Sequence, residues 1–192
     1  MSNPSQPPQR IAPLAPADFS DEARELLSMP LKGFESAETP HFLATLVRHP
    51  GLYRRYAPFA GKLLVNGKLP PRDREYVILR VSWLCQADLE WGTHVALAKE
   101  NVGLSSTEIA RIMAGPADPG HSEHERTLLQ AVDEWQATAM ISDATWAGLA
   151  KTYNDMQLLE LPMLIGAYRM IVSWQNVLRI QRQGNNQGLA AR

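Results

Sequence analysis

The stretch LPPRDREYVILRVSWLCQADLEWGTHVALAKENVGLSSTEIARI, residues 69–112, decides the fold. The proline pair at its start can open a helix, because proline is tolerated in a first helical turn, and the run RDREYVILRVSWL continues that helix. We expect the chain to bend within residues 85–88, since Asp88 is a good N-cap for a second helix over residues 89–103. One continuous helix is the alternative.

Helix signals continue on both sides of this stretch. Ser105 and Ser122 each begin an S-x-x-E capping box before an apolar run, and Ser142 is a third start signal. Residues 155–180 form the last long segment, and its part from 163 to 174 is apolar on most of its circumference. Because alternating strand-like runs are almost absent, the fold class is predicted to be all-α.

Length and composition favour one domain. A chain of 192 residues with 45% hydrophobic content can bury a single sizeable core, which we place in residues 18–192. Residues 1–17 form an N-terminal tail, predicted to be extended and either mobile or draped over a neighbouring subunit, because prolines block both helix and sheet. A loop is expected around residues 30–40. The prolines of the tail are Pro4, Pro7, Pro8, Pro13 and Pro16.

Charge and composition exclude several classes of function. The formal net charge is -1, with acidic and basic residues interspersed, so nothing indicates binding to nucleic acid or to an anionic membrane. No segment approaches the roughly 20 apolar residues of a membrane span, and the first residues do not resemble a signal peptide. Cys85 is the only cysteine and fits a reducing compartment. We therefore expect a cytoplasmic protein.

Three residues carry the chemistry of interest. Glu90 and His94 are four positions apart, so on one helix they share a face. Glu75 would lie roughly 22 Å from Glu90 on a continuous helix, whereas a bend brings it close. A carboxylate beside an imidazole orients the ring and favours its protonated form, which suits acid–base catalysis. The alternative is an ordinary ion pair between Glu90 and His94 that has no catalytic role.

The decisive stretch resembles the core of the carboxymuconolactone decarboxylase family, within the alkylhydroperoxidase D-like superfamily. The family's usual form is close to R-E-x-x-I-L-R-V-x-W, then E-W-x-x-H-V-x-x-A, then G-L-S-x-x-E-I, and all three motifs are present. The later run LPMLIGAYRMIVSWQNVL, residues 161–178, is similar to the family's C-terminal helix. The resemblance implies an alkylhydroperoxidase D-like helical bundle that assembles as a homo-oligomer, either dimer, trimer or hexamer.

The superfamily's thiol peroxidases carry the pattern E-x11-C-x2-C-x3-H. Its outer members fall on Glu75 and His94, whereas its two cysteine positions fall on Ala87 and Glu90. Since disulfide cycling needs both sulfurs, that chemistry is not available here. Glutamate at the second position resembles the decarboxylase branch. Cys85 lies two residues before the first cysteine position, so it is either an idle thiol or the residue of a single-cysteine antioxidant protein.

The resemblance implies a cofactor-independent lyase or isomerase that acts on a small unsaturated or lactone-type carboxylic acid. His94 would donate a proton to the enolate, while Glu75 and Glu90 would orient it or act as base. A metal is not expected, because Glu90 and His94 provide only two ligands. A non-catalytic oligomeric binding module is the remaining hypothesis.

Four further residues are candidates for binding the substrate. Arg74 and Arg80 can clamp a carboxylate, although they can equally be helix charges paired with nearby acids. Trp83 and Trp91 can line a pocket for a flat ligand, although tryptophans at helical spacing are often core residues.

Overall fold

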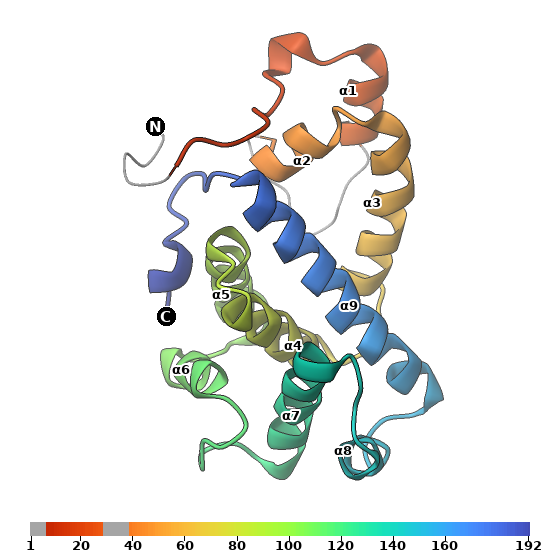
Figure 1. Ribbon diagram of the computed structural model, residues 1–192, viewed down its shortest axis with the longest axis vertical. Coiled ribbons are helices and arrows are strands. Elements are labelled where there is room, and N and C mark those ends of the chain that lie inside the picture. The colour runs from red at the N-terminus through yellow and green to blue at the C-terminus, as the bar shows by residue number, and fades with distance from the viewer. Residues whose placement is uncertain (1–6, 29–38) are drawn as a thin grey trace. The chain divides into compact units, whose positions relative to one another are not determined.

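The structure is a computed structural model, and it describes residues 7–28 and 39–192. Within these residues every regular element is a helix and no strand occurs, which confirms the all-α prediction (Figure 1). The first six residues of the predicted tail, and most of the loop expected at residues 30–40, lie outside the described residues. The helices are α1 (Asp21–Ser28), α2 (His41–Leu46), α3 (Pro50–Leu64), α4 (Pro71–Leu84), α5 (Asp88–Val102), α6 (Ser106–Ala114), α7 (Glu123–Thr138), α8 (Asp143–Leu149) and α9 (Asp155–Leu178), with short 3-10 turns η1 (Pro16–Asp18) and η2 (Gly188–Ala190).

The described chain divides into two compact units. The first unit holds the described residues before Lys68 together with Trp174–Asn185. The second holds Lys68–Ser173 together with Asn186–Arg192, so α9 contributes to both. The expectation of one domain over residues 18–192 stays a prediction.

In the first unit, apolar side chains of α1, α2 and α3 form one core. Its buried members are Ala23, Leu26, Leu43, Leu46, Val47 and Tyr53. Residues 7–14 contain no helix and run beside α2, where the N–H of Leu14 donates to the carbonyl of Ala44 (3.1 Å). Nearby, Nε2 of Gln9 donates to Oγ1 of Thr45 (2.9 Å). The described part of the proline-rich segment is therefore held by its own chain.

Helix α4 is the centre of the second unit. It begins at Pro71, where the missing N–H is not needed, and a carboxylate oxygen of Glu160 accepts the N–H groups of Lys68 and Leu69 just before it (2.7 and 2.9 Å). Residues 75–82 are all buried, because α5, α6 and α7 contact this helix. A helix covered in this way can hold a polar side chain away from water.

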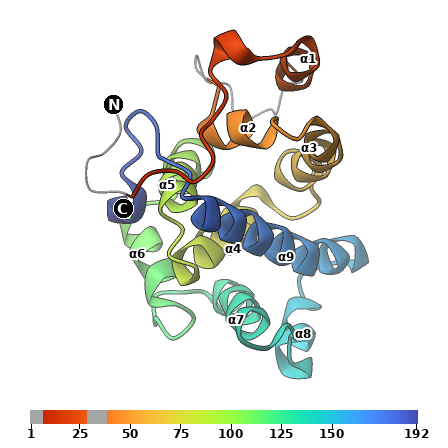
Figure 2. The same ribbon diagram turned by 45° about the horizontal axis from the view of Figure 1, so that its top comes forward.

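The chain reverses direction between α4 and α5, as predicted. After Leu84, Gln86 adopts a left-handed conformation with φ of 50°, and α5 returns beside α4 (Figure 2). The prediction that Asp88 caps α5 is wrong, because Ala87 occupies the N-cap position. Oδ1 of Asp88 instead accepts the N–H of Leu189 near the C-terminus (2.9 Å). The carboxylate therefore holds a distant segment against the start of α5.

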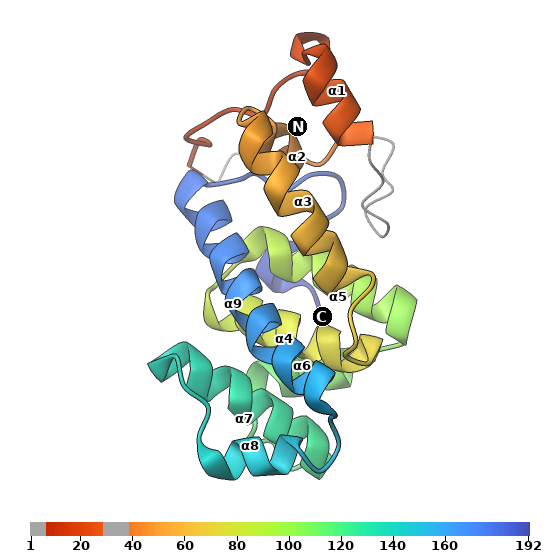
Figure 3. The same cartoon turned by 90° about the vertical axis from the view of Figure 1, so that its right-hand side faces the viewer.

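The two predicted capping boxes open α6 and α7. The hydroxyl of Ser105 accepts the N–H of Glu108, the hydroxyl of Ser122 accepts that of Glu125, and each glutamate bonds back to the serine N–H. The start predicted at Ser142 is confirmed for α8, which lies beside α7 (Figure 3). In the part of the chain that the structure describes, no helix is long and apolar enough to cross a membrane.

Candidate active site

His94 stands at the centre of a cluster of ionisable groups in the second unit. Its Nδ1 lies 2.8 Å from Oε2 of Glu75, and its Nε2 lies 3.4 Å from Oε1 of Glu90. His94 is 0% exposed, and both glutamates are buried with it. The three residues that the sequence suggested for acid–base chemistry are therefore in direct contact.

The reversal of the chain produces this arrangement. Glu75 lies near the start of α4, while Glu90 and His94 lie one turn apart on α5, so their side chains share a face. Nε and Nη2 of Arg74 donate to Oε1 of Glu75 (3.2 and 3.1 Å). Because one carboxylate oxygen binds Arg74 and the other binds His94, the orientation of the carboxylate is fixed.

Burial and charge act on His94 in opposite directions. Burial is the largest single influence, and by itself it lowers the pKa of an imidazole. The carboxylates of Glu75 and Glu90 together outweigh it and raise the pKa of His94 to about 9. For Glu75, burial is again the largest influence and raises the pKa, but His94 and Arg74 bring it below the ordinary value. At neutral pH the pair is therefore imidazolium and carboxylate.

A buried imidazolium between two carboxylates carries one proton that it can transfer. Such a group can give its proton to a carbanion or enolate and recover it afterwards, within a range of pH around neutrality. Among residues 7–28 and 39–192, no group of three or more histidine, cysteine, aspartate or glutamate side chains is arranged to hold a metal ion. What the arrangement offers from its own side chains is proton transfer.

Tyr168 joins this cluster from α9 and was not among the residues suggested by the sequence. Its hydroxyl oxygen lies 3.4 Å from Nε2 of His94. The two rings meet edge to face, with centroids 5.4 Å apart and planes at 85°. Tyr168 lies within residues 163–174, the run that is apolar on most of its circumference, and nothing in that run marks this residue as a partner of a histidine 74 positions earlier.

The arginines suggested for carboxylate binding have different positions. Arg74 lies at the cluster through its bonds to Glu75. Arg80 is turned toward α6 and α7, where Nε and Nη2 donate to both oxygens of Asp133 (2.7 and 2.8 Å). Its Nη1 also donates to the carbonyls of Ile112 and Met113 (2.9 and 2.8 Å). Arg80 therefore joins three helices, and Arg74 is the arginine beside the candidate site.

The two tryptophans stack near the turn between α4 and α5. The ring centroids of Trp83 and Trp91 are 5.1 Å apart, and the two ring planes are tilted by 53° to each other. Trp91 is fully buried, and its Nε1 donates to the carbonyl of Ala191 (3.1 Å). Trp83 is partly exposed, and the guanidinium of Arg192 lies over its ring. In this arrangement Trp91 packs in the core, and Trp83 is the tryptophan that keeps some solvent-exposed surface.

Cys85 ends α4 and contacts α9. Nη1 of Arg169 donates to its sulfur (2.8 Å). Burial is the largest influence on the thiol and raises its pKa, although Arg169 acts in the opposite direction. Since the thiolate is the reactive form, a raised pKa disfavours a redox role at neutral pH.

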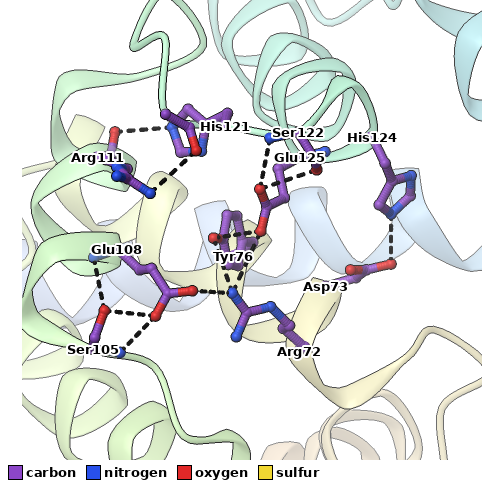
Figure 4. Close-up of polar contacts among 11 residues, drawn as sticks. Arg72, Asp73, Tyr76, Ser105, Glu108, Arg111, His121, Ser122, His124 and Glu125 are labelled. Carbon is purple, nitrogen blue, oxygen red and sulfur yellow. Dashed lines mark hydrogen bonds and ion pairs between the residues drawn. The ribbon is translucent and has the colours of Figure 1, made fainter.

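A second polar cluster joins the starts of α4, α6 and α7 (Figure 4). Arg72 forms an ion pair with Glu108, and a longer one with Glu125 (3.4 Å). The hydroxyl of Tyr76 donates to Glu125 as well (2.8 Å). Both glutamates belong to the capping boxes, so Arg72 and Tyr76 connect two helix starts to α4. This cluster stabilises the second unit.

An aspartate–histidine pair lies beside that cluster. Nε2 of His124 is 2.8 Å from Oδ2 of Asp73, and the hydroxyl of Tyr153 donates to the same oxygen (2.6 Å). The hydrogen bond to Asp73 is the largest influence on His124 and raises its pKa. The two residues of this pair lie 51 positions apart in the chain, so no local pattern relates them. His124 and Tyr153 provide matched controls for His94 and Tyr168.

The sequence of this region matches a known family. Residues 50–134, which contain Glu75, Glu90 and His94, match the profile of the carboxymuconolactone decarboxylase family. No curated protein matches the chain in sequence.

Solved structures share the fold. A peroxidase-related protein from Ralstonia eutropha JMP134, described as an alkylhydroperoxidase AhpD core, has a TM-score of 0.77 at 15% identity over 93% of this chain and 94% of that chain. A peroxidase-related protein from Silicibacter sp. TM1040 has a TM-score of 0.77 at 14% identity over 96% and 97% of the two chains. A cysteine-to-alanine variant of the debrominase Bmp8, in complex with 2,3,4-tribromopyrrole, has a TM-score of 0.76 at 14% identity over 94% and 95%.

At these identities the likeness to solved structures concerns the fold alone, and it agrees with the helical architecture described above. The thiol peroxidase pattern E-x11-C-x2-C-x3-H has cysteines at the two positions that are Ala87 and Glu90 in this sequence. Residues 50–134 of the chain are thus similar in sequence to the carboxymuconolactone decarboxylase family, and the chain shares the fold of the alkylhydroperoxidase AhpD core.

Proposed function

We propose that the protein is a cofactor-independent lyase or isomerase that acts by proton transfer on a small unsaturated or lactone-type carboxylic acid. The observation that carries the proposal is the contact of His94 with two carboxylates, at 2.8 Å from Glu75 and 3.4 Å from Glu90. A protonated imidazole in that setting suits a reaction in which a developing enolate must be reprotonated. The match of residues 50–134 to the carboxymuconolactone decarboxylase family supports the same class of substrate.

The three side chains have separate roles in this proposal. His94 supplies the proton, and Glu75, itself held by Arg74, fixes the ring and keeps it charged. Glu90 lies on the Nε2 side of the ring, where it can accept the proton back or relay it. In this proposal Arg74 binds a substrate carboxylate, since Arg80 is engaged by Asp133 and two carbonyls.

Burial adds a condition for catalysis. Since His94 is 0% exposed, a substrate can meet Nε2 only when the groups that cover it move aside, or through a proton relay. A site closed to water keeps a reactive enolate from unwanted protonation. The debrominase with the same fold is seen with a small ring compound, tribromopyrrole, which supports a ligand of similar size and flatness for this chain.

The test is an activity screen with matched variants. Purified protein is incubated with a panel of small lactone and conjugated carboxylic acids, and carbon dioxide release and ultraviolet spectra report decarboxylation or isomerisation. His94→Gln should abolish turnover of any acid that the wild type converts, because it removes the titrating group. His124→Gln, which alters a half-buried histidine–carboxylate pair away from His94, should retain it. Equal turnover by His94→Gln and wild type would overturn the proposal.

We also propose that the protein works as a homo-oligomer in which α9 contacts a second copy. Met156, Leu159, Met163 and Met170 recur at helical spacing on α9, and each is more than half exposed in the single chain. Four large apolar side chains on one face are costly to leave in water. A second copy of the same helix is complementary to them, because an interface with twofold symmetry pairs a face with itself.

A further inference from the structure

We propose that Tyr168 is a positioning residue for His94, with a hydroxyl that pairs with Nε2 in both protonation states of the imidazole. Its catalytic meaning rests on the function proposed above, whereas the pairing itself can be tested without a substrate. The proposal follows from which nitrogen of the ring can lose its proton.

The Nδ1 side of His94 keeps its proton throughout. Nδ1 faces Oε2 of Glu75 at 2.8 Å, and the pKa of this carboxyl is held low by His94 and Arg74 in spite of its burial. An ionised carboxylate can only accept a hydrogen bond, so Nδ1 must be the donor. The proton that leaves the imidazolium is therefore the one on Nε2.

Two oxygens face Nε2 at equal distance. Oε1 of Glu90 and the hydroxyl of Tyr168 each lie 3.4 Å from it. While Nε2 carries a proton, both oxygens can accept. Once the proton has gone, Nε2 holds a lone pair that needs a donor, and an ionised carboxylate cannot provide one. Tyr168 can, because the hydrogen of a hydroxyl rotates to suit its partner.

The packing of Tyr168 allows this switch without movement of heavy atoms. The ring is buried and meets His94 edge to face at 85°, so its oxygen has a fixed position and only its hydrogen turns. The ionisable groups in contact with the imidazole are Glu75 from α4, with Arg74 behind it, Glu90 from α5 itself, and Tyr168 from α9. Tyr168 is the neutral hydrogen-bonding group in this set.

Each proton that His94 gives to the substrate is replaced by one from solvent. In the proposed reaction, the Nε2 proton of the imidazolium moves to the carbanionic carbon of the enolate, and a new C–H bond replaces the N–H bond. His94 becomes neutral, and the hydroxyl hydrogen of Tyr168 turns to Nε2 while tyrosine stays protonated. One proton taken up from solvent, which is the proton that decarboxylation consumes overall, then restores the imidazolium, and the hydroxyl turns back to become an acceptor. Without Tyr168 the neutral imidazole would be left with an unpaired buried nitrogen, which is unfavourable.

The experiment is a nuclear magnetic resonance titration of the His94 ring in wild type and variants. Tyr168→Phe removes the donor that the neutral ring needs, while the charged ring keeps Glu75 and Glu90 as acceptors. The pKa of His94 should therefore rise, by about one unit, or roughly tenfold in the protonation equilibrium. Glu90→Gln should move it in the opposite direction. Tyr153→Phe alters a buried tyrosine that binds Asp73 and should leave the pKa of His94 unchanged.

A second probe covers the case in which Tyr168→Phe does not fold. 4-Aminophenylalanine introduced at position 168 keeps the ring, does not ionise near pH 9 and donates a weaker hydrogen bond than a phenol, so it should also raise the pKa of His94. An unchanged pKa in both variants, or a fall with Tyr168→Phe, would overturn the inference. These titrations need no substrate. If the expected shifts occur and His94→Gln still turns over its substrate, the inference about Tyr168 stands and the proposed function fails.

Discussion

Nδ1 of His94 and Oε2 of Glu75 are in hydrogen-bond contact at 2.8 Å, although nineteen residues separate them in the chain. The reversal between α4 and α5 creates the contact, and burial removes it from water. Breaking a buried pair of this kind leaves a charge without solvent or partner, which is strongly destabilising. The packing of the two helices is thereby coupled to the protonation of the candidate site.

The free energy of unfolding should fall as the pH rises from about 6.5 to about 9. In the folded protein the pKa of His94 is raised from 6.5 to about 9, so in this window the folded state binds more protons than the unfolded state. The stabilisation is complete below about pH 6.5 and is lost as the pH passes about 9. Urea unfolding at a series of pH values measures it. His94→Gln should flatten the dependence, and an equal slope in that variant would contradict the prediction.

The two glutamates should differ in their effect on stability more than in their effect on turnover. Replacing either one by glutamine should lower turnover by roughly 10² to 10⁴, the usual scale of acid–base assistance. Glu75→Gln should also lower the melting temperature more than Glu90→Gln, because Glu75 binds both His94 and Arg74 at close range. Kinetic assays and thermal melts of both variants measure this. Full activity in Glu75→Gln would rule out its part in catalysis.

Much of the fold could be predicted because its signals are local. Capping boxes act within four residues, so those at Ser105 and Ser122 form where the sequence indicates. The reversal between α4 and α5 occurs where it was predicted, although Asp88, the residue from which it was predicted, is not the cap. Asp88 shows the limit of this reasoning, since its carboxylate is a good cap in isolation but binds Leu189, a residue 101 positions later. A competing partner of that kind cannot be recognised from neighbouring residues.

The candidate site could also be predicted only in part from local signals. Glu90 and His94 are related by one helical turn, so their proximity could be predicted from spacing. The proximity of Glu75 to His94 could be predicted only from the expected bend and from the family resemblance. Tyr168 could not be predicted, because the face that α9 turns toward His94 is set by the packing of helices far apart in sequence. An aromatic residue in an apolar run has the same local appearance whether it touches a catalytic group or the core.

Peroxidase activity that depends on a dithiol cycle should be absent. Ala87 and Glu90 occupy the positions of the two sulfurs, and Cys85 has no second cysteine with which to form an intramolecular disulfide. Consumption of a hydroperoxide in the presence of a dithiol reductant measures this directly. Robust turnover that disappears in Cys85→Ser would contradict the prediction and favour the single-cysteine antioxidant hypothesis instead.

Charged substitutions on the exposed face of α9 should dissociate the oligomer. Met163 and Met170 are about half exposed in the single chain, at 53% and 52%, and lie two turns apart on that helix. Placing lysine at both positions introduces like charges into a self-complementary interface, which opposes association. Light scattering at micromolar concentration should give an oligomer for the wild type and a monomer for the double variant. Met140→Lys, at an exposed methionine outside α9, is the control. A monomeric wild type would refute the assembly.

The segment that follows Asn185 is held tightly against α5 in the second unit. Nδ2 of Asn186 donates to the carbonyl of Leu89 and to Oγ1 of Thr93, both at 3.0 Å. The carbonyl of Ala191 accepts the Nε1 proton of Trp91 (3.1 Å). These bonds reach the turns of α5 that carry Glu90 and His94, so the close fit of this segment helps to hold the candidate site in place.

Gly92 makes that close fit possible, and Gly92→Ala should disrupt it. A Cβ atom at this position would lie 1.9 Å from Oδ1 of Asn186 and 2.7 Å from the backbone nitrogen of Gly188. Alanine favours a helix over glycine by about 1 kcal/mol, but forced repacking typically costs about 1–3 kcal/mol, so the clash should prevail and lower the melting temperature. Gly51→Ala is the control, because a Cβ there meets nothing closer than 3.7 Å. Its melting temperature should stay equal or rise slightly. Equal melting temperatures for Gly92→Ala and Gly51→Ala would mean that the terminal segment is not packed against α5 as described. The conclusion that this segment helps to hold Glu90 and His94 in place would then be wrong.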